Sequence, residues 1–374
     1  MLPPPPPPSG GELPPPPPPH AARRAPRRGW LVLTILAGLL LVALVGSMFV
    51  YVPYYAIAPG EARPTQALIE AEGVELFPSD GEVLFTTVSV RRLTAFGAVV
   101  GWLDDDVDVR TEREVLGDQT PEENRELNLR VMGTSKEVAE YVALTHLGYE
   151  VGVSGGGAVV TDVEPSVPAA AVLTRGDVIT ALDGQPVALV RDLTELLAGR
   201  QPGERIQLQV HTQGSTEERT VEVELAARDD GTAMIGVFLQ QDPSITFDFP
   251  VELTIDSGEV GGPSAGLAFT LAVLDALTPG DLTGGRRVAV TGTINLDGRV
   301  GPIGGLRQKT VAVKQADADV FLVPEAEADV ARAEADGDVL IVGVESLDDA
   351  LAELARLGGN ALALGTPGAA ATPG

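Results

Sequence analysis

The first long apolar segment runs from Trp30 to Val52, where WLVLTILAGLLLVALVGSMFVYV is 23 residues without a charge. Such a run is about the length that spans a 30 Å hydrocarbon core, so we predict a transmembrane helix over residues 30–52. The arginines at positions 23, 24, 27 and 28 lie just before it. Because positive charge stays on the cytoplasmic side, we expect a single-pass protein in the cell membrane, with a cytoplasmic N-terminus and all later domains extracytoplasmic.

A cleaved signal peptide is the alternative for this segment, since Ala56-Ile57-Ala58 resembles a small-residue cleavage site. The apolar run is longer than the 7–15 residues typical of a signal peptide's apolar region. Pro59 would also follow the cut directly. These two features favour an anchor.

The pattern after the anchor changes at about residue 149. Residues 53–148 contain an alternating run, EVLFTTVSV, and a segment of helical spacing, SKEVAEYVALTHLG, which predict an α+β region of unassigned role. Residues 149–229 consist of short β-rich runs divided by glycines and one helical stretch, DLTELLAGR. Asp183-Gly184 is typical of a tight turn between strands. We predict a small β-rich domain over 149–229.

Residues 230–358 alternate apolar runs of two kinds. Strands are predicted at 287–293, 319–324 and 339–344, between helices near 264–277, 305–316, 325–335 and 346–357. This alternation is typical of an α/β domain. The proline tracts of residues 1–29 predict a disordered, extended tail that acts as a spacer or, alternatively, docks on an aromatic groove. Residues 359–374 are expected to be a second disordered tail.

Charge and composition exclude several functions. The net charge of −27 argues against nucleic acid as a partner, because phosphate binding needs a basic surface. The chain has no cysteine, which excludes a thiol nucleophile and a thiolate metal site. His20, His146 and His211 are too scattered to suggest a metal cluster. We therefore expect neither a metal nor a cofactor.

The sequence GPSAG at 262–266 places Ser264 between small residues before an apolar helical run. The pattern fits G-x-S-x-G, but α/β-hydrolases place their histidine after the serine, and no histidine follows Ser264. An esterase is therefore disfavoured, since His146 and His211 lie in regions predicted to be other domains. Serine is also a common helix N-cap, so a purely structural role is the alternative.

Lys309 is the candidate base for this serine. At 100° per residue it shares a helix face with Leu306, Ala312 and Val313, so its side chain is expected to face the core. Desolvation lowers the pKa of a buried lysine. Of the 26 basic residues, 23 are arginine, which cannot lose its proton in proteins. A lysine at an inward position thus suggests a proton acceptor; a structural, ion-paired lysine is the alternative.

Two stretches, GGPSAGL and VTGTINLDGRVGPIGGLRQK, resemble the proteolytic domain of Lon proteases. The resemblance implies that Ser264 is the nucleophile, that Lys309 is the base, and that Thr291 helps to hold the lysine. Backbone N–H groups around the stretch from Gly262 through Pro263 to Ser264 are candidates for an oxyanion hole. ATP-dependent Lon proteases usually carry aspartate where this chain has Gly261. The resemblance therefore does not indicate how the active-site loop of this chain is gated.

The order VPAAAVL, RGDVITALDGQPV, ERIQLQVHTQG in the preceding domain resembles a PDZ domain. The resemblance implies a groove between a strand and a helix that takes a peptide as an added strand. It places the carboxylate-binding loop near Val151-Gly152-Val153, although no GLGF-like match stands there. The Arg175-Gly176-Asp177 tripeptide lies within this pattern, so a cell-adhesion role is disfavoured.

The whole arrangement resembles the membrane-anchored PDZ–Lon proteins of bacteria, and the fold class expected is an α/β Lon-type domain, a small β-rich PDZ domain and one transmembrane helix. The sequence contains no G-x-x-x-x-G-K-[ST] loop, so no ATP is expected to bind in that way. We expect an ATP-independent serine endopeptidase with peptide or protein substrates. A membrane-tethered PDZ binding module with an inert Lon-like scaffold is the alternative. Lon proteolytic domains tend to form rings, so the resemblance makes a homo-oligomer an option that the sequence does not decide.

Overall fold

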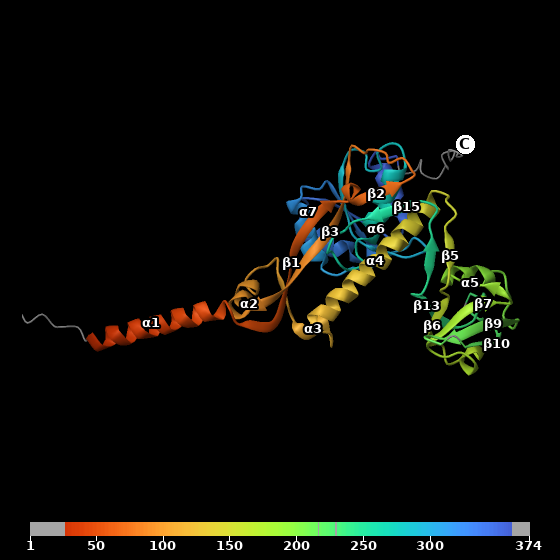
Figure 1. Ribbon diagram of the computed structural model, residues 1–374, viewed down its shortest axis with the longest axis horizontal. Helices are drawn as coiled ribbons and strands as arrows, with labels where there is room; N and C mark the ends of the chain where they lie inside the picture. The colour runs from red at the N-terminus through yellow and green to blue at the C-terminus, as the bar shows by residue number, and fades with distance from the viewer. Residues whose placement is uncertain (1–26, 216, 229, 361–374) are drawn as a thin grey trace, which may run out of the picture.

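The computed structural model describes residues 27–360 apart from residues 216 and 229, and Figure 1 shows an extended helix, a large α/β domain and a small β domain. Helix α1 (Arg27–Ser47) ends earlier than the predicted residue 52. The chain leaves the helix there because Tyr51 already pairs with Thr94 in a sheet. The proline-rich tail up to residue 26 and the tail from residue 361 lie outside the described residues.

The large domain is built on a six-stranded sheet in the order β20-β19-β16-β3-β1-β4. Strands β3, β16, β19 and β20 run parallel, whereas β1 is antiparallel to both β3 and β4. The region at 53–148, for which the sequence indicates no role, therefore supplies half of this sheet. The strands are β1 (Tyr51–Pro64), β3 (Glu82–Thr94), β4 (Asp108–Thr111), β16 (Arg287–Val290), β19 (Val320–Pro324) and β20 (Leu340–Val344).

Alternating side chains of the central strands build a core on each face of the sheet. Leu322 of β19 packs with the helices α4, α6 and α9, while its neighbours Phe321 and Val323 pack with α7 and α8 on the other face. Helix α6 is buried almost all round, as its predominantly apolar sequence predicts. The helices are α4 (Pro121–His146), α6 (Gly266–Leu277), α7 (Leu306–Gln315), α8 (Ala328–Ala335) and α9 (Leu347–Arg356).

Helix α4 is longer than the predicted segment at 135–148 and crosses the large domain (Figure 1). It begins with a capping box, in which the Thr120 side chain accepts from the Glu123 N–H and the Glu123 carboxylate accepts from the Thr120 N–H, with Pro121 at the first helical position. The charged first turns hide the helical period, so the apolar spacing predicts a helix only from residue 135.

The small domain has a sheet with the main path β10-β9-β7-β6-β13, with β8 beside β7 and helix α5 packed on it. The predicted turn is confirmed, since Asp183 and Gly184 have φ angles of 48° and 80°, the positive values that a two-residue hairpin turn requires. The edge strand β13 lies beyond residue 229, where we predicted the end of this domain. The elements are β6 (Ala158–Val163), β7 (Asp177–Leu182), β8 (Gln185–Pro186), α5 (Val190–Leu197), β9 (Arg205–Thr212), β10 (Glu218–Glu224) and β13 (Val237–Gln241).

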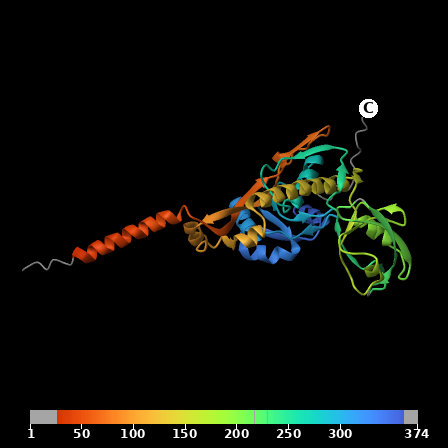
Figure 2. The same ribbon diagram turned by 60° about the horizontal axis from the view of Figure 1, so that its bottom comes forward.

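The small domain is inserted into the large one between α4 and β15, and its two connections run side by side (Figures 1 and 2). One connection carries β5 (Gly152–Ser154) and the other β14 (Thr246–Asp248), which pair antiparallel. Phe247 of β14 packs against Tyr141 of α4 with ring centres 5.0 Å apart. Further short elements are η1 (Gln66–Leu68), β2 (Ile69–Glu72), α2 (Ala95–Gly101), α3 (Glu112–Leu116), η2 (Pro168–Ala171), β11 (Ala226–Ala227), β12 (Ala233–Met234), β15 (Glu252–Ile255), β17 (Thr293–Ile294), β18 (Val300–Gly301) and η3 (Glu325–Glu327).

Candidate active site

Ser264 lies at the mouth of α6, one residue before the N-cap Ala265. The structural alternative expected Ser264 to be the N-cap of this helix, and the structure contradicts it. The loop before it needs a glycine at position 262, because Gly262 has a φ of 96°, in the region that other residues rarely adopt. Ser264 itself is half-buried, with its hydroxyl at the end of a helix whose body is fully packed.

Helix α4 and the strand end at β16 hold this loop through three backbone positions. The Gly262 N–H donates to the Asn128 carbonyl at 2.9 Å, and the Ser135 hydroxyl donates to the Pro263 carbonyl at 3.2 Å. From the other side, the Gly292 N–H donates to the Ser264 carbonyl at 2.9 Å. The orientation of the serine is thus determined by groups from two distant parts of the chain.

Lys309 comes to Ser264 from α7, on the opposite face of the sheet. Its Nζ donates to Ser264 Oγ at 2.7 Å and to Thr291 Oγ1 at 2.9 Å. Thr291 follows β16 directly, and its hydroxyl donates to the Ser264 carbonyl at 3.2 Å. The structure therefore brings the predicted residues Ser264, Lys309 and Thr291 together just past the carboxyl end of a parallel strand, where open α/β sheets commonly hold their sites.

The side chain of Lys309 is buried, with 2% of its surface exposed, as the helical spacing predicts. Burial disfavours the ammonium form and lowers the pKa of Lys309 to about 7, and the charge of Glu327 opposes this shift. Glu327 is itself oriented, because its carboxylate accepts from the Ile303 N–H at 3.1 Å. An amine with a pKa of about 7 exists in substantial part as the neutral base at neutral pH.

Gly261 stands where the Lon resemblance expects aspartate, and the structure gives a steric reason for glycine. A Cβ at this position would lie 2.9 Å from Asn128 Cβ and 3.1 Å from the Asn128 carbonyl carbon. Helix α4 therefore approaches the loop too closely for a side chain. Sequence reasoning did not find Asn128, Ser135 and Glu327. Asn128 and Ser135 contact the Ser264 loop from a helix far away along the chain, and Glu327 acts on Lys309 through its charge from beyond α7.

The small domain has its own groove between β13 and α5, with a volume of about 700 Å³. Strand β13 is the edge of the sheet, and the groove is lined by Leu193 and Leu197 of α5 and by Ile235, Gly236 and Val237 before and within β13. Val151–Val153, near which the resemblance placed the carboxylate-binding loop, instead lie at β5 and pack against the large domain. That placement is wrong: an apolar-Gly-apolar run stands at Ile235-Gly236-Val237, ahead of the edge strand.

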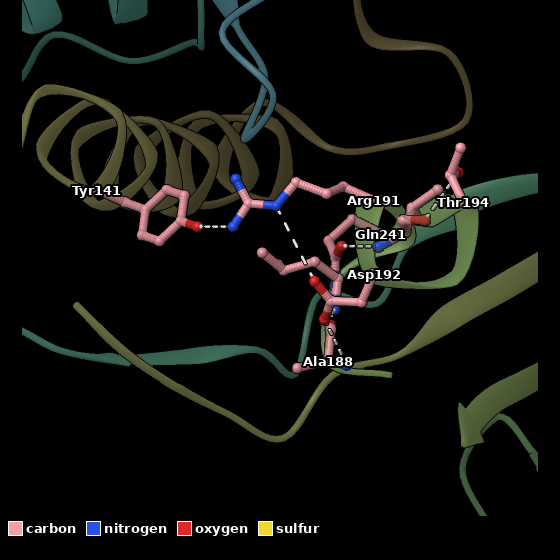
Figure 3. A network of polar contacts seen from close by, with 8 residues as sticks. Tyr141, Ala188, Arg191, Asp192, Thr194 and Gln241 are labelled. Carbon is pink, nitrogen blue, oxygen red and sulfur yellow. Dashed lines mark hydrogen bonds and ion pairs between the residues drawn. The ribbon is translucent and has the colours of Figure 1, made fainter. Parts of the chain in front are cut away.

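A polar network joins this groove to the large domain (Figure 3). The Gln241 side chain, at the end of β13, accepts from the Val190 N–H at 3.0 Å and donates to the Ala188 carbonyl at 2.8 Å. Arg191, in the first turn of α5, points at α4 and donates to the Tyr141 hydroxyl at 2.7 Å. Both walls of the groove are thus connected to the helix that holds the Ser264 loop.

Comparisons with known proteins agree with this division. Residues 145–225 match the PDZ domain, and residues 239–355 match the Lon protease (S16) C-terminal proteolytic domain. The Lon protease of Desulfatibacillum aliphaticivorans is 36% identical over 89 residues, which are 23% of this chain and 10% of that protein. Lon protease 1 of Myxococcus xanthus is 38% identical over 110 residues, 29% of this chain and 13% of that protein. This chain thus matches only about a tenth of the length of those proteases.

Among solved structures, the PDZ domain of the SdrC-like protein from Listeria monocytogenes is 28% identical and covers 23% of this chain and 90% of that one, with a TM-score of 0.22. Together, the sequence matches and the two folds define an α/β proteolytic domain with a β-rich peptide-binding type of domain inserted in it. The chain carries one apolar N-terminal helix, a PDZ domain and a Lon protease C-terminal proteolytic domain, in that order.

Proposed function

We propose that this chain is a membrane-anchored serine endopeptidase that cuts peptide bonds without ATP, with Ser264 and Lys309 as a catalytic dyad. The observation that carries the proposal is the 2.7 Å contact between Lys309 Nζ and Ser264 Oγ at a lysine whose burial lowers its pKa to about 7. A lysine that is neutral near pH 7 can take a proton from a hydroxyl, which a solvated ammonium cannot.

In the proposed reaction, neutral Lys309 accepts the Ser264 hydroxyl proton as Oγ attacks the scissile carbonyl carbon. The lysine then gives this proton to the leaving amine as the C–N bond breaks, which leaves an acyl-enzyme on Ser264. Water attacks the ester, Lys309 takes a proton from it, and the acid product departs as Ser264 regains its proton. Thr291 keeps the amine aimed at Ser264 because its hydroxyl accepts from Nζ and donates to the Ser264 carbonyl.

The oxyanion hole must come from donors near the nucleophile. Within the stretch that the sequence indicated, Pro263 has no N–H, and the Gly262 N–H already donates to the Asn128 carbonyl. The Ser264 N–H is therefore the donor that we propose from this stretch. The Ser135 hydroxyl supports it, because it contacts the carbonyl of the same peptide unit, at Pro263.

The PDZ groove is proposed to bind an extended peptide segment of a substrate or of a regulator. An edge strand offers unpaired backbone groups to such a segment, and the apolar lining from Leu193, Leu197 and Ile235 suits apolar side chains near its end. Both domains then act on peptides or proteins. ATP independence rests on the printed sequence, which contains no phosphate-binding loop of the G-x-x-x-x-G-K-[ST] type.

The membrane anchor is α1, whose segment Trp30–Ser47 has a mean hydropathy of 2.5 and is unburied within the described protein. With arginines before this segment, the PDZ and proteolytic domains are proposed to lie outside the cytoplasm. The sequence suggested domain boundaries at residues 148, 229 and 358. That these boundaries separate parts that fold on their own stays a prediction.

Purified full-length protein in detergent should cleave an unstructured peptide with and without ATP at the same rate, and a serine-reactive phosphonate should label it. Ser264→Ala should abolish both cleavage and labelling while retaining the thermal unfolding temperature. If the folded parent neither cleaves nor labels yet binds peptides at the PDZ groove, the alternative of a binding module with an inert scaffold is correct.

A further inference from the structure

Residues 95–103, AFGAVVGWL, form helix α2 and the turn after it without a single charged side chain. One side of this segment is buried, since Ala98 is enclosed and a Cβ at Gly101 would lie 3.0 Å from Val109. The other side stands free of the protein. We call it the α2 patch, and it consists of Phe96, Val99, Val100, Trp102 and Leu103, of which Leu103 is 81% exposed.

The α2 patch lies where the chain leaves the apolar helix α1 (Figures 1 and 2). The Ala95 N–H donates to the Val50 carbonyl at 2.8 Å, and Thr94 pairs with Tyr51. Phe49, Val50 and Tyr51 are exposed as well. Exposed apolar surface therefore continues from α1 onto the α2 patch without interruption by a polar segment.

We propose that the α2 patch lies in the interface of the same lipid bilayer that α1 crosses, so that the protein contacts the membrane at two elements. The inference rests on the proposed role of α1 as an anchor. Tryptophan and tyrosine favour the headgroup level of a bilayer, because one part of each ring system is apolar and one part is polar. Trp102 is placed for this contact: its ring packs edge-on against Tyr54 at 5.5 Å and is still 60% exposed.

The charges around the α2 patch point to a zwitterionic lipid surface. Asp104, Asp105 and Asp106 follow Leu103 directly, so attraction to anionic headgroups does not drive the contact. A hollow beside the patch is lined by Tyr51, Arg91 and Asp104 among others. It thus presents both signs of charge next to apolar side chains, as a headgroup with a phosphate and an ammonium requires.

The two contacts restrict the orientation of the proteolytic domain. A single helix would allow the domain to tilt freely about the junction at Val50. The second contact is rigid, because α2 packs on β1 and β3, the strands that continue into the central sheet next to α7. The position of Ser264 relative to the bilayer surface is then determined by the fold.

The chain contains two tryptophans, Trp30 and Trp102, which makes a direct test practicable. The full-length Trp30→Phe protein, with Trp102 as its only tryptophan, is reconstituted in phosphatidylcholine vesicles with or without brominated acyl chains. We expect the bromolipids to quench Trp102, and bromines near the headgroup end of the chain to quench more than bromines near its middle. The Trp102→Phe protein reports Trp30, at the other end of α1, in the same vesicles.

The outcomes separate the patch from the anchor. Quenching of Trp30 without quenching of Trp102 overturns the proposal and leaves the anchor intact. Quenching of neither shows that α1 is not inserted, which overturns the anchor and this proposal together. Emission of Trp102 that is blue-shifted but not quenched means that a second copy of the chain covers the patch, which also overturns the proposal.

A matched pair of variants tests the contribution of the patch itself. In the Trp30→Phe protein, Leu103→Asp should reduce the quenching of Trp102 severalfold. Leu340→Asp, a change of the same type at an exposed leucine on the edge strand β20, should leave it unchanged. Equal quenching in both variants, with unchanged thermal unfolding, contradicts the proposal.

Discussion

Arg191 donates a hydrogen bond from its guanidinium to the hydroxyl of Tyr141 at 2.7 Å, and its Cζ lies 5.9 Å from the centre of the same ring (Figure 3). The two residues belong to different domains. Arg191 lies in the PDZ helix α5, which lines the groove, and Tyr141 lies on α4, whose Ser135 contacts the Ser264 loop. A conformational change at the groove can therefore reach the nucleophile through directly contacting residues, from Arg191 to Tyr141 and along α4 to Ser135.

This contact predicts that a peptide bound in the PDZ groove changes the rate at which the proteolytic domain cleaves a short peptide. Tyr141→Phe and Arg191→Met should each reduce that change, and a double-mutant cycle should give a coupling of about 1 kcal/mol between them. Arg205→Met, at an exposed arginine on β9, is the matched control. A peptide effect of the same size in all variants would show that the contact transmits nothing.

Lys309→Arg should abolish peptide cleavage about as completely as Ser264→Ala, by roughly 10³-fold or more, because arginine keeps its proton. The double variant should be little worse than either single one. Lys309→Met serves as the second variant, since methionine suits the apolar surroundings if arginine disturbs the fold. Near-normal activity in a folded Lys309→Arg protein would exclude the Ser–Lys mechanism.

The pH dependence of cleavage should follow Lys309. With a pKa of about 7, kcat/KM should rise tenfold per pH unit below pH 7 and level off above it. Glu327 raises this pKa, so Glu327→Gln should move the rising limb to lower pH. Asp329→Asn removes a solvent-exposed charge from the same region and is the control. A limb that shifts to higher pH in Glu327→Gln contradicts this electrostatic assignment.

Glu140 on α4 is buried, and desolvation, followed by the charge of Glu137, raises its pKa from 4.5 to about 7. The folded state thus binds a proton that the unfolded state has lost, and stability falls as pH rises from 4.5 to 7. Glu140→Gln should raise the unfolding temperature by about 2–4 °C at pH 8 and have little effect at pH 4. The control Glu126→Gln, at an exposed glutamate, should change the unfolding temperature equally little at pH 8 and pH 4. Calorimetry at both pH values measures these unfolding temperatures.

Gly261→Asp should lower kcat about tenfold or more, because its Cβ would meet Asn128 and displace the loop that carries Ser264. Gly133→Asp introduces the same charge on α4, the helix that Gly261 meets, at a position with open space around it. That control should retain activity. An active Gly261→Asp protein would mean that α4 and the loop separate at little cost.

Local pattern was sufficient for much of this fold and for part of the site. The apolar run of α6, the inward face of Lys309 and the turn at Asp183-Gly184 each follow from residues a few positions apart, because helical and strand periods are local properties of the backbone. The sequence motifs around Ser264 and Lys309 were also recognisable without a structure. These features need no knowledge of how distant segments pair.

Only the tertiary structure determined the rest. The pairing of β3 with β16 joins Glu82 to Arg287 and makes the unassigned region part of the proteolytic domain. The approach of Asn128 to Gly261, and of Arg191 to Tyr141, likewise depends on how α4 packs across the large domain. Such contacts are set by side-chain packing and strand register between segments far apart in the chain, which the period of either segment does not encode.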